Sequence, residues 1–90
     1  MAKKHALLVR ERQEEALRVA VGLTLSEEPV EVYVLDRRLA PSPQNAAMIE
    51  VLGELGMRVA TNCAENAGLE LLSNAELARR ILACDTILPY

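Results

Sequence analysis

Short aliphatic runs alternate with helix-forming segments along the whole chain, and this alternation limits the fold more than any other feature of the sequence. Residues 5–9 form an apolar run without period, which is typical of a strand buried on both faces. Residues 30–35 are rich in β-branched side chains and predict a second strand. Further strands are expected at 57–61, 69–72 and 86–88.

Helices are expected between these strands. The charged stretch 10–15 begins the first helix, because acidic residues in a first turn favour the helix dipole. Ser42 and Pro43 are the residue types preferred at the N-cap and at the first position of a second helix. Gly56 is well placed to end that helix in the left-handed conformation.

A third helix is expected after Ser73, because Ser73 and Glu76 match the capping box. Strands separated by helices in this order form right-handed βαβ units. We therefore expect an α/β fold, a three-layer α/β/α sandwich with a mostly parallel sheet of four to five strands. The length of 90 residues fits one domain, residues 1–90.

Composition excludes several classes of protein. Hydrophobic residues make up 51% of the chain and charged residues 26%, a balance that is too apolar for disorder and too interrupted by charge for a membrane protein. The net charge of -3 and the lack of Phe and Trp argue against a nucleic-acid surface, which needs basic and aromatic residues. We expect neither nucleic acid nor a membrane as partner.

The amino-terminal apolar stretch stops at Arg10, short of the hydrophobic region that a signal peptide requires. We therefore expect a cytoplasmic protein with reduced thiols. Cys63 and Cys84 show no C-x-x-C or metal-ligand spacing, and with a single histidine a structural zinc site is not expected. A redox sensor that forms a disulfide between the two cysteines stays open as an alternative.

The candidate site lies where the expected strands end. Ligands of open parallel sheets bind outside the carboxyl ends of the strands. Three loops follow such ends, at 10–12, 36–38 and 62–63. Their candidate crevice residues, besides Cys63, are Arg10, Arg37, Arg38 and Asn62.

Cys63 is the candidate catalytic residue. Residues 63–68 are expected to form a single helical turn closed by Gly68, and a thiol at the start of such a turn faces unpaired N–H groups that favour the nucleophilic thiolate. Arg37 or Arg38 is expected to add a cation nearby. The alternative is a small, partly buried cysteine without chemistry, and this is the preferred interpretation of Cys84. His5, at the amino end of its strand, is expected to be structural.

The sequence lacks the motifs that bind several classes of cofactor. The sequence has neither the G-x-x-x-x-G-K nor the G-x-G-x-x-G motif, and its four glycines do not cluster into a phosphate cradle. The places where a phosphoacceptor domain carries acidic residues hold Arg10–Glu11 and Asn62–Cys63. We expect no cofactor.

The segment 56–68, in which a strand leads into a single cysteine and then a short turn ending in glycine, resembles the DsrE/DsrF/DsrH-like (TusD-like) sulfur-relay family. Segments 16–25, 72–78 and 83–88 are similar to that family's first helix and to its last helix and strand. The resemblance implies that Cys63 accepts sulfur as a persulfide. It also implies homo-oligomers, commonly trimers or hexamers, or hetero-oligomers of related subunits.

The leading hypothesis is therefore a small sulfur-relay protein, with sulfur donor and acceptor proteins as partners and Cys63 as the carrier. The rival is a non-catalytic oligomeric DsrE-like subunit or a small-ligand binding module. Fold membership alone does not decide between them, because one fold hosts many functions.

Overall fold

All five strands of the sheet are parallel and lie in the order β4-β3-β2-β1-β5. The structure, a computed structural model, describes residues 3–90. The strands are β1 (His5–Val9), β2 (Val30–Val34), β3 (Arg58–Thr61), β4 (Glu70–Leu71) and β5 (Thr86–Pro89). Their bounds agree with the expected runs to within one or two residues. The predicted α/β fold is confirmed, with a sheet that is wholly parallel.

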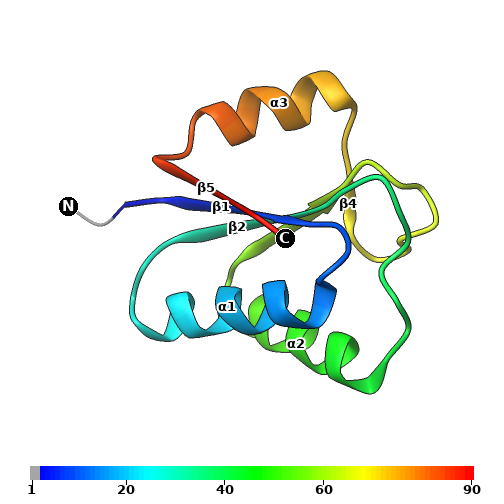
Figure 1. Ribbon diagram of the computed structural model, residues 1–90, viewed down its shortest axis with the longest axis horizontal. Helices are drawn as coiled ribbons and strands as arrows, with labels where there is room; N and C mark the ends of the chain where they lie inside the picture. The colour runs from blue at the N-terminus through cyan, green and yellow to red at the C-terminus, as the bar shows by residue number, and fades with distance from the viewer. Residues whose placement is uncertain (1–2) are drawn as a thin grey trace.

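Helices cover both faces of this sheet (Figure 1). The helices are α1 (Gln13–Leu25), α2 (Pro43–Glu54) and α3 (Asn74–Leu82). Figure 1 shows α1 and α2 side by side below the sheet and α3 alone above it. The chain moves from β1 outward to β4 and then returns through α3 to place β5 on the other side of β1. This is the three-layer arrangement expected from alternating strands and helices.

Side chains of alternating strand residues form a core on each face of the sheet, as the period of two in a strand requires. Leu7, Val9 and Val32 point to the face that Leu17 and Leu52 of α1 and α2 cover. The core on the opposite face is smaller. Its buried residues are Ala6, Tyr33, Leu35, Ala60 and Leu77.

The helix ends follow the predicted signals, with one exception. Ser42 Oγ accepts a hydrogen bond from the Asn45 amide, and Gly56 has the left-handed φ of +77° that ends α2. Ser73 Oγ caps α3 by accepting from the Glu76 amide. The other hydrogen bond of the expected capping box, from the Ser73 amide to the Glu76 side chain, is wrong. The Glu76 carboxylate instead binds the guanidinium groups of Arg79 and Arg80.

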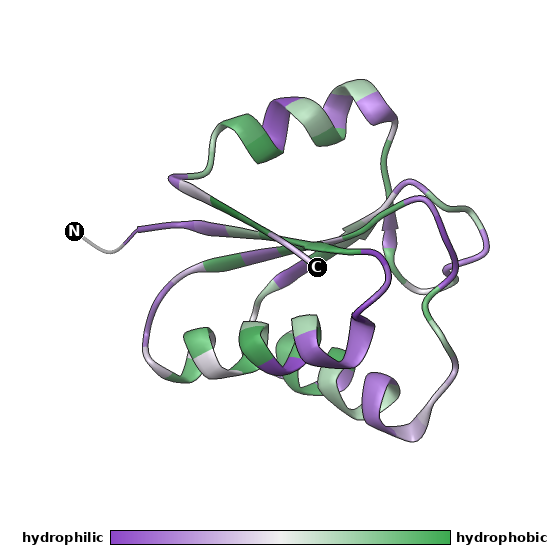
Figure 2. Ribbon diagram, in the orientation of Figure 1, coloured by the Kyte–Doolittle hydropathy of each residue, from purple (hydrophilic) through white to green (hydrophobic). Residues whose placement is uncertain are grey.

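Hydrophilic residues gather in the loops that follow β1 and β2, as the colouring in Figure 2 shows. Because all strands are parallel, these loops and the loop after β3 lie at the same edge of the sheet. The predicted convergence of the three loops on this carboxyl edge is therefore confirmed.

Candidate functional site

Three polar side chains connect the loops at the carboxyl edge. Arg10 Nε donates to Asp36 Oδ2 at 3.2 Å, and Asn62 Nδ2 donates to Asp36 Oδ1 at 3.0 Å. Asn62 Oδ1 in turn accepts from the Asp36 amide at 2.8 Å. Asp36 has a positive φ of 67°, a conformation that aspartate tolerates better than most residues. The hydrogen bond from Asn62, followed by that from Arg10, lowers the pKa of the Asp36 carboxyl.

A small cleft of about 210 Å³ lies between this network and α3. Its polar wall contains Arg10, Asp36, Asn62 and Asn74, and its apolar wall includes Leu77 and Ile81. Two of the predicted crevice residues, Arg10 and Asn62, thus line a real cleft. Both are already engaged with Asp36, so a ligand in the cleft would have to compete with these contacts.

Cys63 lies two residues after the end of β3, at the carboxyl edge, and is half-buried. Its backbone is fixed on both sides, because its amide donates to Thr61 Oγ1 at 3.0 Å and its carbonyl accepts from the Asn66 amide at 3.1 Å. Cys63 does not line the cleft beside α3. The backbone of Cys63 is therefore fixed at this edge, and the residue lies outside the cleft.

The expected helical turn at residues 63–68 is wrong. The Asn66 amide donates to the Cys63 carbonyl and the Ala67 amide donates to the Glu65 carbonyl, so the chain forms successive tight turns. Gly68 closes the loop with a φ of +86°, as its residue type predicted. Without a helix, the dipole argument for a thiolate at Cys63 no longer applies.

The two arginines predicted near Cys63 face different surroundings. Arg37 Nη2 lies 3.9 Å from Glu11 Oε1. Arg38 lines a larger cavity on the other face of the edge, between α2 and the loop that follows Cys63. Within residues 3–90, neither guanidinium has an ion pair or hydrogen bond with Cys63.

Buried polar side chains concentrate at this edge, and the sequence reasoning missed them. The buried polar residues of the described chain are Gln13, Asn45, Thr61 and Asn66. Thr61 Oγ1 donates to the Val34 carbonyl at 2.7 Å and accepts from Asn66 Nδ2 at 2.9 Å. With the Cys63 amide as a further donor, this hydroxyl uses its full hydrogen-bonding capacity.

The three buried amides fix the loop that follows β2. Asn66 binds both the Leu39 amide, at 2.7 Å, and the Arg37 carbonyl. Gln13 Oε1 accepts from the Ala40 amide at 2.8 Å, and Asn45 Nδ2 donates to the Ala40 carbonyl at 3.0 Å. The signal in the sequence was faint, because each is an uncharged polar residue in a loop or in the first turn of a helix, where exposure is the usual expectation.

Cys84 lies near the amino ends of the strands, at the opposite end of the sheet from Cys63, in a polar cluster under α3. Its thiol is within 3.6 Å of Glu31 Oε1, which also accepts from the Tyr33 hydroxyl. Burial, together with the charge of Glu31, raises the pKa of Cys84 to about 11. Burial of Glu31 opposes its ionisation, but the Tyr33 hydrogen bond and the charge of Lys4 outweigh it and lower the pKa of this carboxyl.

The separation of the two cysteines excludes a disulfide within the folded chain. Glu31, which contacts Cys84, and Val34, which pairs with Thr61, are three residues apart on β2, or about 10 Å. Cys63 lies two residues beyond Thr61. Disulfides require Cα atoms within about 7 Å of each other. The redox-sensor alternative would need the sheet to open.

His5 lies at the amino edge, away from the site, as expected. One ring nitrogen bonds to Thr86 Oγ1, and the other lies 2.7 Å from Glu28 Oε2. The ring therefore joins the starts of β1 and β5 to the loop before β2.

Comparison of the chain with known protein families, with curated proteins and with solved structures gave no match. None of the helices in residues 3–90 has both the length and the apolar character that crossing a membrane requires. The same residues include no group of three or more histidine, cysteine, aspartate or glutamate side chains placed to bind a metal ion.

Proposed function

We propose that this chain is a DsrE-like sulfur-relay protein that accepts sulfur on Cys63 and passes it to an acceptor thiol. The observation that carries the proposal is the position of Cys63, half-buried at the carboxyl edge of a parallel sheet on a backbone held by Thr61 and Asn66. A partly accessible thiol on a fixed backbone suits repeated transfer between two partners. The resemblance of the segment 56–68 to the sulfur-relay family supports the same function.

The transfer needs no cofactor. The Cys63 thiolate attacks the outer sulfur of a donor persulfide, the S–S bond of the donor breaks, and the donor leaves as a thiolate with the electron pair. Cys63 then carries a persulfide. An acceptor thiolate attacks its outer sulfur in the same way and restores the Cys63 thiolate.

The partners in this proposal are a sulfur donor protein, an acceptor protein and further copies of this chain or related subunits, in the cytoplasm. Exposed hydrophobic side chains support an assembly, because Leu71 on the edge strand β4 is 57% exposed and Ile87 on the other edge strand is 45% exposed. Leu82 at the end of α3 is 78% exposed. A trimer or hexamer would cover such side chains.

Intact-mass spectrometry after incubation with a small persulfide donor tests the proposal. We expect the mass of one sulfur atom to be added to the wild type and to Cys84→Ala, and not to Cys63→Ala. Cys84→Ala is the matched control because it removes the other thiol. Loading of Cys84, or of neither thiol, would leave the non-catalytic subunit or ligand-binding module as the better description.

A further inference from the structure

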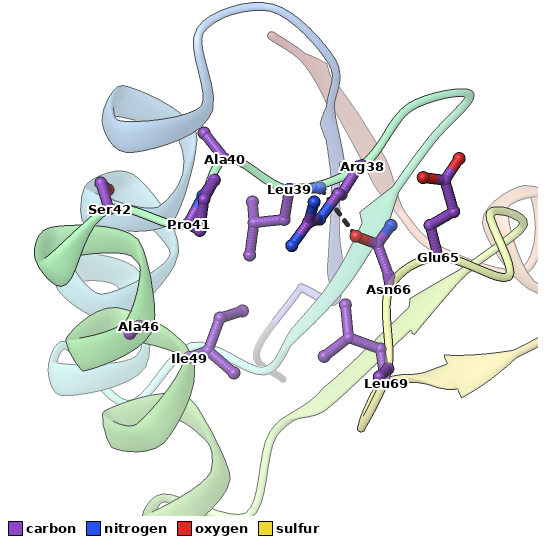
Figure 3. A pocket seen from close by; sticks show the side chains of 11 residues that line it. Arg38, Leu39, Ala40, Pro41, Ser42, Ala46, Ile49, Glu65, Asn66 and Leu69 are labelled. Carbon is purple, nitrogen blue, oxygen red and sulfur yellow. Dashed lines mark hydrogen bonds between the residues drawn. The ribbon is translucent and has the colours of Figure 1, made fainter.

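A cavity of about 370 Å³ opens between the start of α2 and the loop that follows Cys63 (Figure 3). Leu39, Ala46, Ile49 and Leu69 supply apolar walls. At about 30 Å³ for each water-sized group, a volume of 370 Å³ holds about twelve such groups. The cavity is therefore large enough for a small organic molecule and falls in the size range of ligand sites.

Two charged residues line the cavity, Arg38 and Glu65, and they differ in direction. Figure 3 shows the Arg38 guanidinium pointing inward between Leu39 and Asn66, whereas the Glu65 carboxylate points away. Within residues 3–90, the Arg38 guanidinium makes no ion pair and no hydrogen bond, in contrast to Arg10 and Arg37. All of its donors are thus available to a ligand.

The wall that carries Arg38 is rigid. Asn66 Oδ1 accepts from the Leu39 amide, as the dashed line in Figure 3 marks, and Gln13 Nε2 donates to the Arg38 carbonyl at 3.3 Å. Buried side chains thus hold the backbone in two places, with Gln13 binding at Arg38 and Asn66 binding at Leu39. A backbone fixed in this way spares a ligand the entropic cost of ordering it.

We propose that this cavity binds a small aliphatic carboxylate, with the carboxylate on Arg38 and the alkyl chain against Leu39, Ile49 and Leu69. A planar guanidinium matches a carboxylate with two parallel hydrogen bonds, and apolar walls select for an alkyl body. The site uses side chains other than Cys63. It goes beyond the sulfur-relay proposal and does not depend on it.

Titration of the full chain with acetate, butyrate and hexanoate, followed by NMR of the backbone amides, tests the proposal. We expect saturable shifts at the amides of Leu39, Ala46 and Leu69, and an affinity that rises by about fourfold for each added methylene. Arg38→Gln should weaken hexanoate binding by about ten- to a hundredfold. Arg18→Gln, which removes an exposed arginine of α1 outside the cavity, is the matched control and should stay within about twofold.

Four results would overturn the site, and the first three concern the carboxylate. They are an absence of saturable shifts at these amides, an equal affinity for hexylamine and hexanoate, or an equal loss in the two arginine variants. Tight binding of inorganic phosphate with no gain from the alkyl chain would also overturn it, because the apolar walls would then have no part. The titration is repeated on Cys63→Ala, whose affinity for hexanoate should not change. Carboxylate binding is thereby tested independently of sulfur loading on Cys63.

Discussion

Thr61 and Asn66 are joined by a hydrogen bond of 2.9 Å from Asn66 Nδ2 to Thr61 Oγ1, and both side chains are buried. The same hydroxyl donates to the Val34 carbonyl on β2 and accepts from the Cys63 amide. One hydroxyl therefore ties two strands to the loop that carries the candidate nucleophile. The geometry of that loop depends on this pair more than on any contact of the thiol itself.

Thr61→Val should destabilise the fold by about 1–3 kcal/mol, because it leaves the Cys63 amide and the Asn66 side chain without their acceptor at a buried position. Thr61→Ser keeps the hydroxyl and loses only a methyl group, so its cost should be about 1 kcal/mol. Urea unfolding of both variants measures the difference. A Thr61→Val variant as stable as Thr61→Ser would show that these hydrogen bonds contribute little.

Asn66→Ala should free the loop that bears Arg38, since the Leu39 amide and the Arg37 carbonyl both lose their partner. We expect amide hydrogen exchange at Leu39 to rise about tenfold or more. The amide of Asn45, which bonds to Ser42 at the start of α2, serves as an internal control. If both amides change equally, the effect is global destabilisation and not local release.

Alkaline pH should weaken the fold through Cys84. Its folded-state pKa of about 11 lies above the ordinary value near 9, so its contribution to the free energy of unfolding is complete below pH 9 and is lost as the pH rises towards 11. Burial and the neighbouring Glu31 also raise the pKa of Tyr33, which acts in the same direction at higher pH. Urea midpoints across this range should fall less steeply in Cys84→Ala than in the wild type.

Alkylation gives a second measure of the same shift. In a Cys63→Ala background, iodoacetamide should label Cys84 much more slowly in the folded chain than in urea at pH 9, where the free thiol is about half ionised. Equal rates in the two states would contradict the burial of this thiol against Glu31.

Mild oxidation should leave the folded chain without an internal disulfide, because Cys63 and Cys84 lie at opposite edges of the sheet. The intact mass should show no loss of two hydrogens under native conditions. In urea, where the distance constraint is lifted, the same oxidant should produce that loss. A disulfide formed in the native state would require a different arrangement of β3 and α3.

Local pattern was enough to predict the strands and helices. The apolar run 5–9 and the β-branched run 30–35 have few other ways to bury their side chains, and Ser42, Pro43 and Gly56 mark helix ends through their own backbone preferences. The same reasoning predicted that the loops after β1, β2 and β3 meet. That conclusion needs only that the strands be parallel.

The helical turn at Cys63 could not be judged in this way, because residues distant in sequence decide it. The side chain of Asn66 binds the Leu39 amide and the Arg37 carbonyl, which lie 27 and 29 positions away. Nothing within 63–68 reveals these partners. The prediction of a turn closed by Gly68 was right, and the prediction that this turn is helical was wrong.

The sequence by itself determined an α/β chain with a cysteine at the carboxyl edge of its sheet, because burial and turn preferences act over a few neighbouring residues. Only the tertiary structure decided that Arg38 points into a cavity, that Cys63 lies outside the cleft beside α3, and that Cys84 lies at the far edge. Such facts depend on which strands are neighbours and on which buried polar groups find partners, and both are settled only when the whole chain packs.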